Sequence, residues 1–273
     1  MYRGETPVKK VARLYFWNHV RTLVGPERFK AGPHVVLSGP DAGDVATLLG
    51  MGVKPNGIVA VDTDRHAVDA AYWKFPGMDI RHEDVREALA AMKNPPVSVF
   101  LDTCHHVSNK SLELTKDCLR LCEGSVLGIA VYACREQSAT REALNALKAQ
   151  GIRGERLRAH LLTQQLYGRC TSHGWYASRW IYYSAHSEDR YGKPMLIGVG
   201  KCRKFPRILA ERREMLKGAG KKMEVMTYSP KGFARALCAA VDVKGRQGLL
   251  QYNVREQEVA AWRAHLTRGT YRR

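Results

Sequence analysis

The sequence lacks the features that mark membrane-spanning and disulfide-stabilised secreted proteins. Its longest apolar run extends only from Val126 to Ala133, far shorter than the roughly 20 residues that a membrane-spanning helix needs. The first ten residues contain no hydrophobic segment of the kind found in secretory signals. The seven cysteines are odd in number and show no framework spacing, which favours reduced thiols. We therefore expect a cytoplasmic protein that does not enter the membrane.

Acidic residues are scarce relative to basic ones. The chain has 26 Asp and Glu against 44 Lys and Arg, a net charge of +18. Residues 201–273 alone carry 18 basic and 6 acidic side chains, a net charge of +12. A segment with this excess favours a polyanionic partner, and nucleic acid before a membrane surface. A basic tail that only increases solubility is the alternative interpretation.

Between about residues 34 and 200, short β-rich runs alternate with amphipathic segments. Five such βα units predict an α/β fold with a doubly wound, mostly parallel sheet. The strand-like runs are nearly continuous in apolar residues, as expected where helices cover both faces of the sheet. Two further runs, 178–187 and 194–202, are joined by a polar turn without a helix. They predict a terminal antiparallel hairpin.

The pattern changes near residues 201–206, where we place a domain boundary. Residues 1–204 are expected to form a Rossmann-like domain that includes an amphipathic N-terminal helix over residues 11–24. Residues 205–273 are expected to form a small basic all-helical region. This region either binds nucleic acid or caps the first domain with a solvated basic face.

Four loops at the carboxyl edge of the predicted sheet carry polar groups suited to a nucleoside ligand. Gly39 lets the chain turn sharply after the first strand, and Gly43 lets the next helix present its N-terminal N–H groups. Asp62 follows Gly43 by 19 residues, the spacing at which nucleotide-binding sheets place a ribose-binding carboxylate. Asp84 follows the third strand, where it could accept an adenine amino hydrogen. Asp102 ends the fourth strand, near the reacting atoms.

With these residues and the closing hairpin, residues 33–200 resemble the class I S-adenosylmethionine-dependent methyltransferases. The resemblance implies S-adenosylmethionine as cofactor and a catalytic position for Asp102 near the methyl group or its acceptor. It implies cofactor contacts at five positions: Gly39, Asp41, Gly43, Asp62 and Asp84.

The Gly-rich turn departs from the family pattern at two positions. Leu37 stands where the family has an acid, and Asp41 replaces the middle glycine. A carboxylate at Asp41 could replace the missing anion that the methionine ammonium needs, or it could repel the methionine carboxylate. Both alternatives remain open at this point.

The loop after the fourth strand offers candidates for proton transfer. His105 or His106 could act as a general base because the pKa of histidine lies near neutrality. A loop in which one histidine only bonds to backbone is the other interpretation. Cys104 with nearby histidines and cysteines could suggest zinc, but adjacent histidines do not easily reach one ion. We expect no metal.

Aromatic and basic residues are candidates for contact with nucleic acid. Trp175 and Tyr176 are expected in a loop, where they could stack on a flipped or single-stranded base. In the basic tail, Arg255, Arg263 and Arg268 are available to phosphates. The sequence thus predicts a methyltransferase that acts on DNA or RNA. The alternative is a non-catalytic nucleic-acid-binding protein that keeps the fold as a scaffold in a larger assembly.

Overall fold

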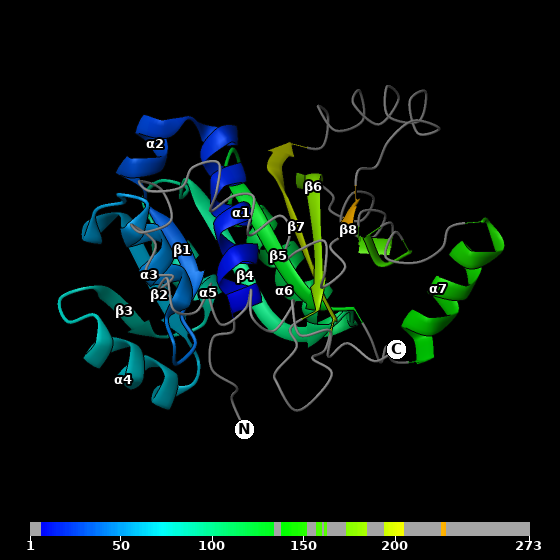
Figure 1. Cartoon of the computed structure of the whole chain (residues 1–273), viewed down its shortest axis with the longest axis horizontal. Helices are drawn as coiled ribbons and strands as arrows, with labels where there is room; N and C mark the ends of the chain where they lie inside the picture. The colour runs from blue at the N-terminus through cyan, green and yellow to red at the C-terminus, as the bar shows by residue number, and fades with distance from the viewer. Residues whose placement is uncertain are drawn as a thin grey trace, which may run out of the picture.

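The computed structural model describes residues 7–133, 138–151, 157–159, 161–162, 173–184, 194–204 and 225–227. In these ranges eight strands form a single sheet in the order β3-β2-β1-β4-β5-β7-β6-β8 (Figure 1). The strands are β1 (His34–Leu37), β2 (Ile58–Asp62), β3 (Asp79–His82), β4 (Ser98–His106), β5 (Val126–Tyr132), β6 (His173–Ser184), β7 (Pro194–Lys204) and β8 (Val225–Thr227).

The first five strands are parallel, and the strand order reverses between β1 and β4. β7 then inserts antiparallel between β5 and β6, with Val126 opposite Lys201 and Tyr132 opposite Met195. This confirms the predicted doubly wound sheet with a terminal antiparallel hairpin. In sheets of this kind ligands bind outside the carboxyl ends of the strands at the point of reversal.

Helices cover both faces of the sheet, and the central strands β1, β2, β4 and β5 contribute alternate residues to the two sides. Val35 belongs to one buried cluster and Val36 to the other, as the twofold period of a strand requires. One face carries α1 (Pro7–Val24), α2 (Pro26–Ala31), α3 (Gly43–Gly50) and α4 (Arg65–Lys74); the other carries α5 (Val85–Ala90), α6 (Asn109–Leu121) and α7 (Ser138–Ala149).

The N-terminal helix α1 lies directly on the sheet, crossing in front of it in Figure 1. It makes this approach because β5 carries Gly128 beneath it. A Cβ atom at Gly128 would lie 2.2 Å from the Phe16 ring, a distance that real Cβ atoms do not adopt. Phe16 instead packs on Phe100 with ring centroids 4.2 Å apart. The position of α1 is therefore determined by a residue without a side chain.

His34, the first residue of β1, links this strand to β4 and α2. One ring nitrogen bonds Ser98 Oγ at 2.7 Å, and the other bonds the Phe29 carbonyl oxygen at 2.6 Å. Burial lowers the pKa of His34 to about 4, so the ring is neutral near pH 7. It is a structural histidine.

Two sequence expectations about strands need correction. β6 begins at His173, so Trp175 and Tyr176 lie in a strand and not in a loop. β8 lies inside the region that was expected to contain only helices, and it pairs in parallel with β6 from Trp180 to Tyr182. The helices expected elsewhere in residues 205–273, and the boundary placed near residue 204, lie outside the described residues.

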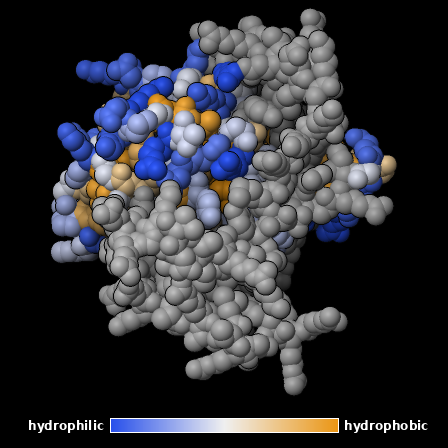
Figure 2. All heavy atoms as spheres, turned by 45° about the horizontal axis from the view of Figure 1, so that its top comes forward, coloured by the Kyte–Doolittle hydropathy of each residue, from blue (hydrophilic) through white to orange (hydrophobic). Residues whose placement is uncertain are grey.

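On the face shown in Figure 2 the described surface is mostly hydrophilic, with smaller apolar areas between the polar side chains. Among the described residues, Tyr72 and Trp73 on α4 are the large apolar side chains that are exposed, Trp73 with 83% of its surface accessible. Within the described ranges no helix combines the length and the apolar character needed to cross a bilayer.

Candidate functional site

A cavity of about 640 Å³ lies where the carboxyl ends of the first four strands meet. This volume is in the range of small-molecule sites. Its wall includes the turn after β1, the ends of β2 and β3, and the end of β4 with the start of α6. Lys9 and Arg13 of α1 also line it. The cavity therefore occupies the point of strand reversal where the fold predicts a ligand.

Asp62 connects the first two strands at the cavity. Its Oδ2 accepts a hydrogen bond from the Gly39 N–H at 3.0 Å, and its Oδ1 accepts one from the Asp64 N–H at 2.9 Å. Gly39 has a φ of 53°, a left-handed conformation that suits glycine. A carboxylate oxygen can accept a second bond, so Asp62 can both support the turn and contact ligand hydroxyls.

Asp84 lines the cavity but already has strong local partners. It is the N-cap of α5, and its side chain accepts from the Arg86 N–H at 2.8 Å. The Arg86 guanidinium also donates to both oxygens, at 2.9 and 2.8 Å. These hydrogen bonds from Arg86 lower the pKa of Asp84. Asp84 thus begins α5 and holds Arg86 at the rim, in addition to any contact with a ligand.

The sequence interpretation missed a buried carboxylate, Asp44, in the first turn of α3. Asp44 is 2% exposed and lines the cavity. Its Oδ2 accepts from Arg13 Nε at 3.0 Å, and its Oδ1 accepts from Trp17 Nε1 at 2.8 Å. Burial raises the pKa of Asp44, with Arg13 opposing this shift and Asp102 adding to it. A signal was available in the sequence, because Lys9, Arg13 and Trp17 are spaced four residues apart on one helix.

The remaining residues of the turn differ in their access to the cavity. Ser38 and Gly39 line it, whereas Asp41 and Gly43 do not appear in its wall. The Asp41 carbonyl oxygen accepts a hydrogen bond from Lys74 Nζ at 2.8 Å. Gly43 begins α3 and is buried beneath it. The acidic residue nearest to this turn that does line the cavity is Asp44.

The end of β4 and the start of α6 form another part of the wall. Asp102 lines the cavity, as do Thr103 and the exposed His105. The β4–β5 register shifts between Asp102 and His106, so the backbone here departs from regular pairing. Lys110 follows on the first turn of α6, whose N-cap is Ser108. The candidate catalytic residues Asp102 and His105 thus both line the cavity from the end of β4.

The cavity wall is acidic although the chain as a whole is basic. It contains four cationic side chains and seven carboxylates. The cations are Lys9, Arg13, Arg86 and Lys110; the carboxylates are Asp44, Asp62, Asp64, Glu83, Asp84, Asp102 and Glu113. Such a wall favours a ligand that carries positive charge and hydroxyl groups over one that is a bare polyanion.

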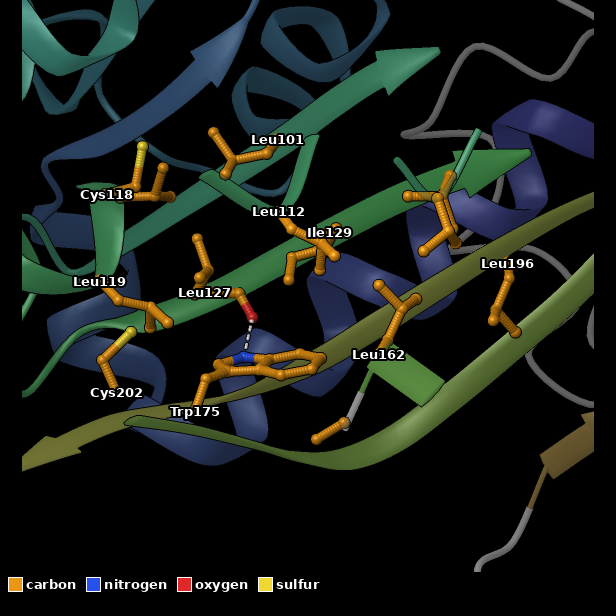
Figure 3. Close-up of a cluster of buried hydrophobic side chains, with 14 of the residues drawn as sticks. Leu101, Leu112, Cys118, Leu119, Leu127, Ile129, Leu162, Trp175, Leu196 and Cys202 are labelled. Atoms are coloured by element: carbon orange, nitrogen blue, oxygen red, sulfur yellow. Dashed lines mark hydrogen bonds between the residues drawn. The ribbon is translucent and has the colours of Figure 1, made fainter. Parts of the chain in front are cut away.

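Trp175, a predicted nucleic-acid contact, belongs to the core instead. It is 0% exposed, and its indole Nε1 donates to the Leu127 carbonyl oxygen at 2.9 Å (Figure 3). Figure 3 places it among apolar side chains that include Ile129 and Leu196. The expectation for Trp175 is therefore wrong. The side chain of Tyr176 lies outside the described residues, as do Arg255, Arg263 and Arg268.

Among the described residues, no group of three or more His, Cys, Asp and Glu side chains is arranged to hold a metal ion. Cys118 on α6 and Cys122 directly after this helix are buried free thiols. Burial raises the pKa of Cys122 to about 12 and that of Cys118 still further, so both remain protonated.

No protein-family model matches the chain, and no curated protein matches it. Solved methyltransferase structures are similar to it at low identity. The magnesium protoporphyrin IX methyltransferase of Synechocystis, with bound S-adenosylhomocysteine, is 14% identical over 74% of this chain and 90% of its own, with a TM-score of 0.41. The O-methyltransferase of Bacillus cereus, also with S-adenosylhomocysteine, is 12% identical over 73% and 84%, with a TM-score of 0.41.

A putative RNA methyltransferase of Pyrococcus horikoshii is 11% identical over 68% of this chain and 84% of its own, with a TM-score of 0.40. At such identities and TM-scores, these likenesses assign neither an activity nor a substrate to this chain. The fold class follows from its own strand order, a mostly parallel sheet that reverses between β1 and β4 and has antiparallel β7 inserted between β5 and β6.

Proposed function

We propose that the chain is an S-adenosylmethionine-dependent methyltransferase that acts on nucleic acid. One observation supports the cofactor most strongly: an acid-rich cavity at the point of strand reversal in a chain whose net charge is +18. S-adenosylmethionine carries a sulfonium, an ammonium, a ribose diol and an adenine, and each suits a carboxylate or a polar backbone group. The residues of the wall fit such a ligand in charge and hydrogen-bonding type.

The chain's own residues take distinct roles in this proposal. Asp62, at the end of β2, binds the ribose hydroxyls while it holds the Gly39 turn. Val85 and Leu114 supply apolar wall for the adenine near the end of β3. When bound, S-adenosylmethionine would supply a sulfonium methyl group: an acceptor lone pair would attack the methyl carbon in line, and S-adenosylhomocysteine would leave as the carbon–sulfur bond breaks. Asp102 and His105 face the acceptor, and His105 accepts the proton that the methylated atom releases.

The basic charge supports nucleic acid as the acceptor. Residues 201–273 carry a net charge of +12, and such a segment binds phosphates in a salt-sensitive, sequence-independent way. Arg255, Arg263 and Arg268 lie in this segment. Lys110 and Arg86 add cationic groups at the cavity. A base can then enter the acidic cavity while its phosphates stay on basic groups.

The competing proposal is a nucleic-acid-binding protein that keeps the fold without catalysis. Leu37 in place of the family's acid favours it. The carboxylates in the cavity oppose it, because a scaffold alone gives no physical reason to gather seven acids at one sheet edge.

Thermal unfolding with and without S-adenosylmethionine and S-adenosylhomocysteine separates the two proposals. A ligand at about 100 times its dissociation constant adds about 2.7 kcal/mol of stability, which shifts the midpoint by a few degrees. Transfer of a labelled methyl group to RNA or DNA, with free nucleosides as control acceptors, then tests the substrate. A well-folded chain that shows no shift and no heat of binding would overturn the enzyme proposal in favour of the scaffold.

A further inference from the structure

Where α1 crosses α3, the cavity wall contains a polar cluster that is almost fully buried. Arg13 is 7% exposed, Asp44 is 2% exposed, and Ser38 at the end of β1 is 5% exposed. All three line the cavity. Charged and hydroxyl groups are rarely buried to this degree unless other groups satisfy them.

The charges of this cluster are divided between its two sides. Lys9 and Arg13 come from one face of α1, and they are the cations of the wall that this helix supplies. Asp44 and Asp102 come from α3 and β4, and their charges interact. Arg13 and Asp44 meet in an ion pair, with Nε and Oδ2 3.0 Å apart, and Lys9 on α1 and Asp102 on β4 add a further cation and a further carboxylate to the wall. The complement of such a mixed site is a zwitterion, with an ammonium directed to the acids and a carboxylate directed to α1.

Ser38 provides a second and independent sign of a ligand. Its Oγ is buried in the cavity wall and has no hydrogen-bond partner within the described residues. A buried hydroxyl without a partner is costly, so a polar ligand atom at this place would satisfy it. The adjacent residue, Leu37, cannot offer a polar group, although the family pattern places an acid there.

We propose that Arg13, Asp44 and Ser38 form the recognition site for the α-amino and α-carboxylate groups of the cofactor. This inference rests on the proposed methyltransferase function. The acid missing at position 37 is replaced by Asp44, seven residues later. Arg13 and Trp17 of α1 orient that carboxylate, so α1 is part of the binding site. The cavity then selects ligands with an intact amino-acid end over truncated nucleosides.

Calorimetric titration of the full chain with two probes tests the selection. S-adenosylhomocysteine has the amino-acid end, and 5′-methylthioadenosine lacks it but keeps the nucleoside and the sulfur. The parent should bind S-adenosylhomocysteine at least about tenfold more tightly than 5′-methylthioadenosine, because one hydrogen bond to a charged group contributes about that factor in affinity. Arg13→Gln and Asp44→Asn should each lower that affinity about tenfold or more, and should change the affinity for 5′-methylthioadenosine by less than about twofold.

Ser38→Ala is the variant least able to disturb folding, because its hydroxyl has no partner among the described residues. It should weaken S-adenosylhomocysteine about fivefold, within the range for one neutral hydrogen bond, and leave 5′-methylthioadenosine unchanged. Arg21→Gln, on α1 but outside the cavity wall, is the matched control and should behave like the parent.

The outcomes distinguish the two levels of the proposal. A parent that binds neither probe overturns the proposed function and this inference with it. If the parent binds both probes equally, only the recognition site is overturned. The same holds if the variants lose affinity for both probes or for neither. Loss confined to S-adenosylhomocysteine, with retained binding of 5′-methylthioadenosine as proof of folding, supports it.

Discussion

Residues 31–133 and residues 201–273 carry net charges of opposite sign. The first range contains β1 to β5 and most of the cavity wall, and its 9 basic and 13 acidic residues give −4. The second range has a net charge of +12. A polyanion is attracted to the second and repelled by the first. In the proposed function, this difference separates a cationic cofactor from the phosphates of the substrate.

Among substitutions in the acidic region (residues 31–133), Asp62→Ala should have the largest effect on cofactor binding. The change removes the proposed ribose contact and the acceptor of the Gly39 N–H. We expect the affinity for S-adenosylhomocysteine to fall about 100-fold, measured by calorimetry, with unchanged affinity for nucleic acid. Asp69→Ala removes an exposed acid that pairs with Arg65 on α4 and should change neither. A variant at Asp62 that binds like the parent would place the ribose elsewhere.

Arg255, Arg263 and Arg268 lie in the basic region (residues 201–273). Replacing all three with glutamine should weaken nucleic-acid binding and leave cofactor binding unchanged. If each contacts one phosphate, the slope of log affinity against log salt should become shallower by about 2 to 3. Fluorescence anisotropy with a labelled oligonucleotide at several salt concentrations measures this slope. The control replaces Arg65, Arg81 and Arg120 of the acidic region. Equal losses in both triple variants would contradict a localised nucleic-acid surface.

The pH dependence of cofactor binding should report on Asp44. Burial raises its pKa above the ordinary value near 4, so the folded chain holds a proton there that the unfolded chain releases. The free energy of unfolding of the ligand-free protein therefore falls as pH rises through this interval. A ligand ammonium favours the ionised form, so affinity should rise up to about tenfold per pH unit and then level off.

Asp44→Asn has no such titration, and its affinity for S-adenosylhomocysteine should be lower and nearly independent of pH over that interval. Isothermal titration in buffers with different ionisation enthalpies would detect the proton that the parent releases on binding. Identical pH profiles in parent and variant would show that another group titrates.

The smallest expected effect is that of a substitution at Trp175, which tests whether this residue belongs to the core or to a binding surface. Trp175→Phe loses the hydrogen bond to the Leu127 carbonyl oxygen and should lower the free energy of unfolding by about 1 kcal/mol. Denaturant unfolding measures this change. Nucleic-acid affinity should stay at the parent value. A selective loss of that affinity would instead restore Trp175 as a surface contact.

Local patterns predicted much of the fold and part of the site. The alternation of apolar runs with amphipathic segments predicted the parallel sheet, and the missing helix between two late runs predicted the antiparallel β7. Asp62 was predicted from its distance to Gly43, and it does line the cavity. These features are accessible because strand period, turn glycines and connection length are local properties of a chain.

Other features were missed because they depend on distant partners. Asp44 is held by side chains 27 and 31 residues earlier in the chain, and no pattern near Gly43 indicates which face of α1 meets it. Trp175 was assigned to a loop because the strand-like run was expected to begin only at Ser178. Its carbonyl partner is 48 residues away on β5, and the pairing with β7 extends the strand to His173.

The sequence by itself determined the fold class and the opposite charges of the two regions. Composition and short-range periodicity are sufficient for these because they require no knowledge of which segments meet. Only the tertiary structure decided that Asp44 and not Asp41 reaches the cavity, and that Trp175 is in the core. Burial and hydrogen bonding across the sheet decide such questions, and both arise only when segments far apart in the chain pack together.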